Sequence, residues 1–283
     1  MDVFSNNLTA FMDVIRRYKL TGGAITDEEV FEKYTVITDI IIEQKATGGN
    51  ADRLDKISEY VDKLLTATVD VDCAFIVEKL GPKFRDTKDP KLAKKIFALM
   101  IQQKCTSDPL AMEVAELVIV EAPDYGIAKF IAQKAAADGD TEKAQKYFEQ
   151  AIDLTDDNSK KSEIYLSLAR IQSTSGKSVA RSSARRALAF DPSNREAYVF
   201  IGDLYMNSYK ECQAGESRVK DRGVFLAAYE MYQKGGDSER MASAKAQFPS
   251  IEEIFNENLE EGQSLTVGCW INETVKLERR PAN

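Results

Sequence analysis

The chain has 283 residues, of which 43% are hydrophobic, so it can bury a sizeable core in one elongated array or in one or two compact domains. Its 38 basic and 46 acidic residues give a net charge of −8, spread along the chain, which argues against nucleic acid or an anionic membrane as the main partner. No apolar run reaches the roughly 18–20 residues of a membrane span, and the first twenty residues lack the pattern of a signal peptide. We therefore expect no direct membrane insertion.

Three helices are predicted before residue 70. Residues 4–20 place apolar side chains on one helical face, beginning with Phe4 and Leu8, and Gly22-Gly23 ends this helix. A second helix begins at Asp27 and a third covers residues 51–66. We interpret residues 1–69 as an N-terminal helical region of degenerate repeats.

The next segment repeats a pattern of small, aromatic and proline residues about every 34 positions. Units that begin at Leu92, Tyr125, Lys161 and Arg195 are 33, 36 and 34 residues apart. The positions that recur are Ala111-x3-Ala115-x2-Val118, Ala144-x3-Phe148-x2-Ala151, Ala180-x3-Ala184-x2-Ala187 and Tyr198-x2-Ile201-Gly202-x2-Tyr205, with Pro123 and Pro192 as terminators. This pattern resembles the tetratricopeptide repeat.

That resemblance implies an all-α fold, a solenoid of antiparallel helix pairs in which neighbouring pairs bury each other's apolar faces. Small residues such as Ala132 and Gly202 then lie where helices approach most closely. Gly139 and Gly176 fall at turns between paired helices, where a residue that tolerates positive φ ends a helix at little cost. We assign residues 70–236 to this array. An unrelated helical bundle is the alternative.

The C-terminal part departs from the repeat. The spacing between Tyr205 and the next alanine that fits the repeat is longer than in the other units, which predicts an insertion at about 210–223. Residues 237–283 form a predicted cap with short helices near 238–247 and 251–259. After Gly262, apolar and polar residues alternate with the period of a strand, so we expect a short extended or β-hairpin tail.

Four cysteines and the absence of histidine limit the possible chemistry. Cys73, Cys105, Cys212 and Cys269 contain no C-x-x-C pair, which makes a zinc site improbable. They are either four separate thiols in a reducing compartment or two disulfides. Spacing alone leaves both interpretations open.

The tail also resembles one particular group of proteins. Residues 261–274, Glu-Gly-Gln-Ser-Leu-Thr-Val-Gly-Cys-Trp-Ile-Asn-Glu-Thr, are similar to the C-terminus of exported tetratricopeptide proteins of Gram-negative anaerobes, as are segments around Cys73 and Cys105. The resemblance implies a C-terminal fragment of a longer protein, in the periplasm or at the outer membrane, and it favours disulfides; the cytoplasm is the alternative. The predicted order of helices then pairs Cys73 with Cys105 and Cys212 with Cys269.

The sequence favours binding over catalysis. Without histidine, the commonest general base is missing, and Gly176-Lys177-Ser178 lacks the rest of a phosphate-binding loop. We expect no cofactor, no metal and no enzymatic activity. The cluster Lys177, Arg181, Arg185 and Arg186 is interpreted as a solvated helix face, with an acidic-peptide contact as the alternative.

A protein or an extended peptide is therefore the expected partner. In tetratricopeptide proteins the first helices of successive units line a groove, and the matching positions here include Lys129, Gln133, Tyr165, Gln172, Glu196 and Asp203. Plain solvated surface is the simpler interpretation of each. A second hypothesis is a structural spacer or assembly component that acts through its ends rather than its groove. The oligomeric state does not follow from the sequence.

Overall fold

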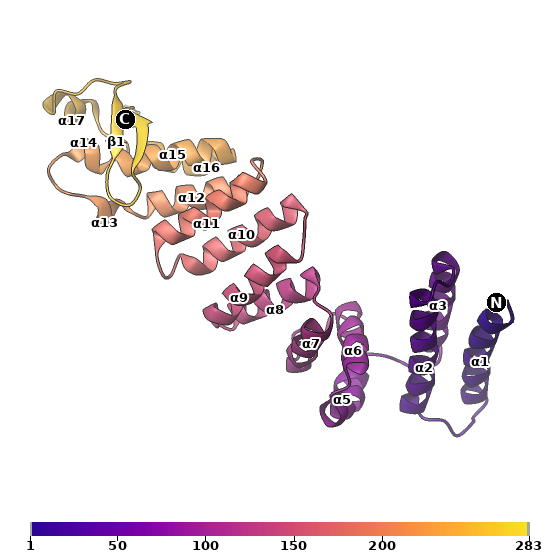
Figure 1. The fold of residues 1–283 in the computed structure, drawn as a ribbon. Coiled ribbons are helices and arrows are strands. Elements are labelled where there is room, and N and C mark those ends of the chain that lie inside the picture. The colour runs from indigo at the N-terminus through magenta and orange to yellow at the C-terminus, as the bar shows by residue number, and fades with distance from the viewer. Residues whose placement is uncertain (1, 282–283) are drawn as a thin grey trace. The chain divides into compact units, whose positions relative to one another are not determined.

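The computed structural model describes residues 2–281, with side chains from residue 7 onward; the predicted core residue Phe4 lies outside the described side chains (Figure 1). The chain forms two compact units, Met1–Ala122 and Pro123–Asn283, which are treated separately below as unit 1 and unit 2. The division between them falls inside the segment 70–236 that the sequence assigns to one array. Across the described residues, no helix is both long and apolar enough to cross a bilayer.

Unit 1 consists of seven α-helices and one π-helical turn among the described residues. They are α1 (Asp2–Leu20), α2 (Asp27–Ala46), α3 (Ala51–Thr66), α4 (Cys73–Phe75), η1 (Ile76–Leu80), α5 (Gly81–Thr87), α6 (Pro90–Gln102) and α7 (Pro109–Glu121). Both α1 and α2 pack on α3, and α6 packs on α7. The buried stripe of each helix recurs every three or four residues, as expected for helices with one apolar face.

Ion pairs attach α2 to the segments that follow α3. Glu28 pairs with Lys79 (3.1 Å), and the Lys95 ammonium lies 2.8 Å from Asp39 Oδ1. The rings of Phe31 and Phe75 meet edge to face, with 6.1 Å between centroids. One face of α2 therefore contacts the later helices of unit 1, in addition to the face that packs on α3.

Unit 2 contains three successive helix pairs followed by a cap. The elements are α8 (Tyr125–Ala137), α9 (Thr141–Asp153), α10 (Asn158–Gln172), α11 (Lys177–Phe190), α12 (Arg195–Met206), α13 (Tyr209–Cys212), α14 (Arg218–Asp221), α15 (Gly223–Gly235), α16 (Ser238–Lys245), α17 (Ile251–Asn256), β1 (Ser264–Val267) and β2 (Glu273–Lys276). The close pairs are α8 with α9, α10 with α11 and α12 with α15. This is the predicted tetratricopeptide-like arrangement of sequential helix pairs. The short helices α13 and α14 separate α12 from its partner α15.

Helix starts are fixed by local sequence. Asp, Asn, Ser or Thr stands at most N-caps, and its side chain accepts a hydrogen bond from the first turn, as Asp124 does from Gly126 and Ile127. Proline follows the cap in α6 and α7, where its missing N–H costs nothing. At the turns, Gly139 adopts the expected positive φ of 82°, whereas Gly176 is extended, with φ 169°.

Small residues let the paired helices approach. Ala132, Ala144, Ala180 and Ala187 are fully buried. Helices α12 and α15 also approach closely: a Cβ added to Gly202 would lie 2.5 Å from Cε1 of Tyr232. Only glycine leaves room for this ring, which explains why Gly202 stands at the repeat's small-residue position.

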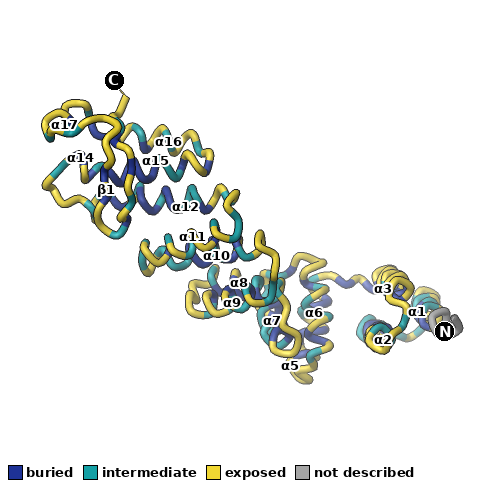
Figure 2. Tube along the Cα trace, turned by 45° about the horizontal axis from the view of Figure 1, so that its top comes forward, coloured by how far each residue is buried: buried dark blue, intermediate teal, exposed yellow. Residues whose placement is uncertain are grey.

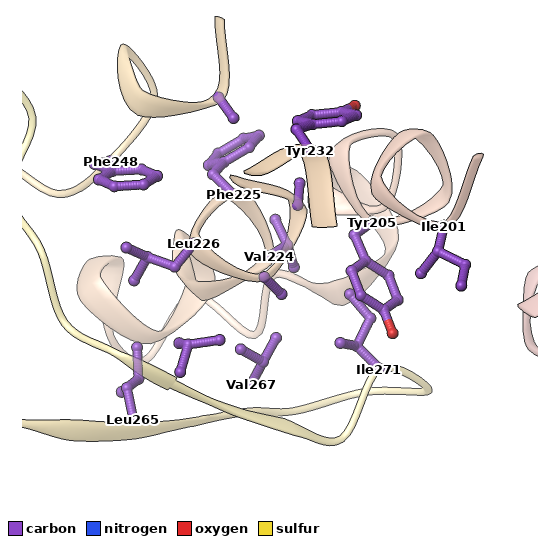
Figure 3. Packing of buried hydrophobic residues seen from close by; sticks show 14 of the residues in the cluster. Ile201, Tyr205, Val224, Phe225, Leu226, Tyr232, Phe248, Leu265, Val267 and Ile271 are labelled. Carbon is purple, nitrogen blue, oxygen red and sulfur yellow. The ribbon is translucent and has the colours of Figure 1, made fainter. Parts of the chain in front are cut away.

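The tail forms the expected hairpin. Strands β1 and β2 are antiparallel, with Leu265 opposite Val275. Leu265, Val267 and Val275 are buried against α15, which presents Gly223 beneath Val267 and Leu265 (Figure 3). Figure 2 shows buried residues along α15 and β1, as well as along the earlier helices. The hairpin therefore covers an apolar face of α15 that would otherwise be exposed.

The tail contacts two members of the basic cluster of α11, Arg181 and Arg185, whereas Arg185 and Arg186 remain exposed, as expected for a solvated face. Arg181 donates to the carbonyl of Ile271, and Arg185 pairs with Glu273. Glu273 also accepts a hydrogen bond from the Tyr205 hydroxyl at 3.1 Å, and the guanidinium of Arg181 lies 5.1 Å from the Trp270 ring centroid. An acidic segment does contact the cluster, but it belongs to the same chain.

One of the two predicted disulfides is present. Cys212 and Cys269 are bonded, with Cα atoms 5.4 Å apart and a separation of 57 positions in the sequence. Cys73 and Cys105 are free thiols, contrary to the predicted pairing. The Cys73 thiol donates instead to the carbonyl of Gln103 at 3.6 Å.

The two free thiols give a testable pH dependence. Burial, reinforced by the hydrogen bond with Cys73, raises the pKa of Cys105 from 9.0 to about 11. Alkylation of Cys105 in the folded protein at pH 8 should be about 100-fold slower than that of an ordinary thiol, since the thiolate reacts. Between about pH 9 and 11 the unfolded chain releases this proton and the folded chain keeps it, so stability should fall as pH rises.

Quantitative labelling of thiols checks which cysteines are free and which are bonded. Unreduced protein that is unfolded in denaturant should expose two reactive thiols, and mass spectrometry should locate them at Cys73 and Cys105. Four labelled cysteines would contradict the Cys212–Cys269 disulfide, and none would show that the second pair also forms.

Candidate functional site

Ion pairs connect the first helices of successive pairs in unit 2. Lys129 Nζ on α8 lies 2.6 Å from Glu163 Oε1 on α10, and Arg170 Nη2 on α10 lies 2.8 Å from Glu196 Oε2 on α12. Asp203 Oδ1 on α12 lies 3.1 Å from Arg240 Nε on α16. These three pairs, here called the charged ladder, show that α8, α10, α12 and α16 turn charged side chains towards one another.

The middle pair of the ladder is held loosely, and Lys129 more firmly. Glu196 and Arg170 are 73% and 53% exposed, so their ion pair contributes about 0–1 kcal/mol to the free energy of folding. Burial works against the charge of Lys129, but the hydrogen bond and charge of Glu163, together with Tyr125, outweigh it and raise the pKa of the lysine. Charges that gain so little from each other can exchange these partners for a ligand at small cost.

The register of α10 decides which predicted groove residues face the ladder. Tyr165 stacks on Phe190 of α11, with ring centroids 5.4 Å apart. Gln172 accepts a hydrogen bond from Ser183 of α11 at 2.6 Å. Both residues thus lie against the partner helix, whereas Lys129, Glu196 and Asp203 take part in the ladder. Gln133 is exposed on α8, one turn after Lys129.

A one-residue shift accounts for this difference. Twelve residues separate the buried Ala132 of α8 from Ala144 of α9, but only eleven separate the equally buried Ala169 of α10 from Ala180 of α11. The segment that joins these two contact positions is therefore one residue shorter in the second pair. As a result, Glu163 and Arg170 occupy the inner face of the array. A count of positions back from Ala180 does not select these two residues. The signal was present in the small residue Ala169, which corresponds to Gly202.

The ladder ends at a hollow of about 650 Å³ in unit 2. Val199 and Phe200 supply its apolar surface, and the lining charges of both signs include Arg195, Glu196 and Glu239. Where α15 ends, Gly235 lies directly on α12: an added Cβ would be 2.7 Å from Val199 Cγ2. Gly236, with φ 71°, then turns the chain into α16 and places Arg240 beside the hollow.

Asp203 is fixed from two sides. It accepts hydrogen bonds from the Tyr232 hydroxyl (2.9 Å) and from Arg240 Nε (3.1 Å). Burial, together with the hydrogen bond to Asp203, raises the pKa of Tyr232 above its usual value. Hydrogen bonding to Asp237 first, and the charge of Asp203 next, raises the pKa of Arg240. This end of the ladder is consequently a rigid wall of the hollow.

Comparisons with known proteins give only distant likenesses. No family model matches the sequence, and no curated protein matches it. Among solved structures, the chain is similar to the crystal structure of MamA protein, with a TM-score of 0.40 and 16% identity over 74% of this chain and 97% of the other. It is also similar to the human IFIT1 dimer with PPP-AAAA, with a TM-score of 0.35 and 12% identity over 85% of this chain and 62% of the other. These likenesses transfer no function.

Proposed function

We propose that this chain is a non-catalytic scaffold that binds an extended polypeptide segment in the hollow of unit 2. The supporting observation is the charged ladder, which leads along α8, α10 and α12 to a hollow with an apolar surface. An extended segment can follow the ladder while one of its apolar side chains contacts Val199 and Phe200. The absence of histidine from the chain supports a binding role over acid–base catalysis.

The lining chemistry narrows the ligand class. Lys129 and Gln133 partly fit the carboxylate clamp of tetratricopeptide proteins, but Tyr165 contacts α11 and Ala169 is buried. Charges of both signs surround the hollow, with Arg195 and Glu239 close to the apolar surface. The favoured ligand is therefore an internal segment of mixed charge with a central apolar residue, not a free C-terminus.

The proposal includes an oxidising compartment. The Cys212–Cys269 disulfide fits a protein that folds outside the cytoplasm, and the resemblance of the tail implies the cell envelope. The alternative role, a structural spacer, would use surfaces away from the hollow.

A charge-swap experiment tests the ligand site. Peptides selected from a random linear library against the full chain are titrated against Glu196→Arg by isothermal calorimetry. Because Glu196 is 73% exposed, this change should leave folding intact and weaken binding at least tenfold, as like charges now face each other across the ladder. The matched control is Glu149→Arg on α9, which is also exposed.

Equal affinities for wild type and Glu196→Arg would contradict the proposed site, as would a loss of affinity in Glu149→Arg. Failure to select any peptide in repeated rounds would contradict the proposed function itself.

A further inference from the structure

Unit 1 contains a second cavity, of about 830 Å³, beside α2, α3 and α6. We call it the unit 1 cleft. Side chains of Val36, Ile40, Ile41, Ile42 and Ala98 give it an apolar surface. Two of these side chains are largely open to solvent, since Val36 is 55% and Ile42 is 57% exposed. The volume of the unit 1 cleft lies within the range of roughly 300–1,000 Å³ that is typical of sites for compact ligands.

The charges around the unit 1 cleft are partly paired. Asp39 is occupied by Lys95, Asp62 accepts a hydrogen bond from the Tyr34 hydroxyl, and Lys45 pairs with Asp55. Lys91 and Lys94 are exposed on α6 and line the cleft, together with Glu43. An occupant should therefore present an apolar side chain with a carboxylate close by.

Helix α17 of unit 2 has this chemistry on a face that is exposed among the described residues. Phe255 is 77% exposed, more than any other large hydrophobic residue among those described, and Ile251 is 55% exposed. Four residues apart, they lie on one face of the helix, and the exposed Glu252 follows Ile251 directly.

The helix holds this face in a fixed position. Ser250 and Glu253 form a capping box, and Glu257 accepts a hydrogen bond from the backbone N–H of Val219. Phe255 is therefore presented on an ordered helix, and little conformational entropy remains to be lost when it is bound.

From these complementary surfaces we infer that the protein self-associates, with α17 of one copy in the unit 1 cleft of a second copy. Phe255 and Ile251 contact Val36 and Ile42, while Glu252 meets Lys91 and Lys94. Two different surfaces form this contact, so it is heterologous and extends to further copies unless it closes into a ring. The inference goes beyond peptide binding, since it uses neither the charged ladder nor the hollow.

Sedimentation velocity over a range of concentrations tests this inference on the full chain. Wild type should form oligomers, whereas Phe255→Ser and Val36→Glu should each raise the dissociation constant at least tenfold, the loss expected for a central aromatic anchor. Both positions are exposed, so circular dichroism should remain that of wild type. Val120→Ser on α7, which removes another 74% exposed side chain, is the matched control and should associate normally.

Mixing the two defective variants gives the sharper result. Phe255→Ser keeps its cleft and Val36→Glu keeps its α17, so the mixture should form one-to-one dimers and stop there. A charge swap adds a second readout: Lys94→Glu should weaken association, and Glu252→Lys in the same chain should restore it.

A wild type that stays monomeric at every concentration would overturn the inference. A mixture that forms no dimers would overturn it too, because the oligomers of wild type would then depend on a contact other than that between α17 and the unit 1 cleft.

Discussion

Replacement of both Cys212 and Cys269 by serine is expected to destabilise the tail of unit 2 by about 4 kcal/mol. The disulfide closes a loop of 57 residues, and the chain-entropy model assigns a cost of this size to such a loop in the unfolded chain. Apart from the disulfide, the tail is held by a two-stranded hairpin buried against α15 and by the contacts of Glu273 with α11. Isolated hairpins of this size are marginal in water.

Trp270 makes the measurement specific. It is the only tryptophan of the chain, it follows Cys269, and its ring lies 5.6 Å from that of Tyr205. In the double serine variant, tryptophan fluorescence should change at lower temperature than the helical circular dichroism signal. The matched control, Cys73→Ser, removes a free thiol and should leave both transitions in place. Unchanged coincident transitions in the double variant would contradict the role of the disulfide.

Gly202→Ser is expected to lower the free energy of unfolding of unit 2 by about 3 kcal/mol, the upper part of the usual overpacking range. The new Cβ would lie 2.5 Å from the Tyr232 ring, which cannot withdraw easily because it is buried and its hydroxyl is bonded to Asp203. The added hydroxyl would also be buried. Thermal and urea unfolding followed by circular dichroism measure the loss.

Gly176→Ser is the matched control, because the same substitution there meets open space. Its φ of 169° suits any residue, the nearest atom to an added Cβ is 4.0 Å away, and serine is a favourable N-cap for α11. Its stability should stay within a few tenths of a kcal/mol of wild type or rise slightly. Equal stabilities of the two variants would show that the α12–α15 contact relaxes freely.

The sequence predicts the helix pairs well because their signals are local. Ala180, Ala184 and Ala187 lie on one helical face, and the structure buries all three. The alternation after Gly262 likewise predicts the hairpin, since a strand with one buried face repeats every two residues. In both cases the spacing of apolar residues along a single element carries the information.

Features that depend on distant residues were missed. The partner of Arg181 and Arg185 is Glu273, about 90 residues later, and no local pattern distinguishes such a pair from a solvated face. The groove residues of α10 differ from the prediction because the segment from Ala169 to Ala180 is one residue shorter than the segment from Ala132 to Ala144, which changes the inward-facing positions but leaves the apolar periodicity intact. Each residue turns a helix by about 100°, so a shift of one is enough to replace Glu163 and Arg170 by buried neighbours.

Amide hydrogen exchange of the full chain, with and without a selected peptide, tests the proposed binding site most directly. The account predicts slower exchange in α12 and at the start of α16, which surround the hollow, and in α10, where the ladder leads to it. Helices α9 and α11, on the other side of each pair, should exchange at the same rate in both samples. Protection confined to α9 and α11, or no protection in unit 2 at a saturating peptide concentration, would contradict it.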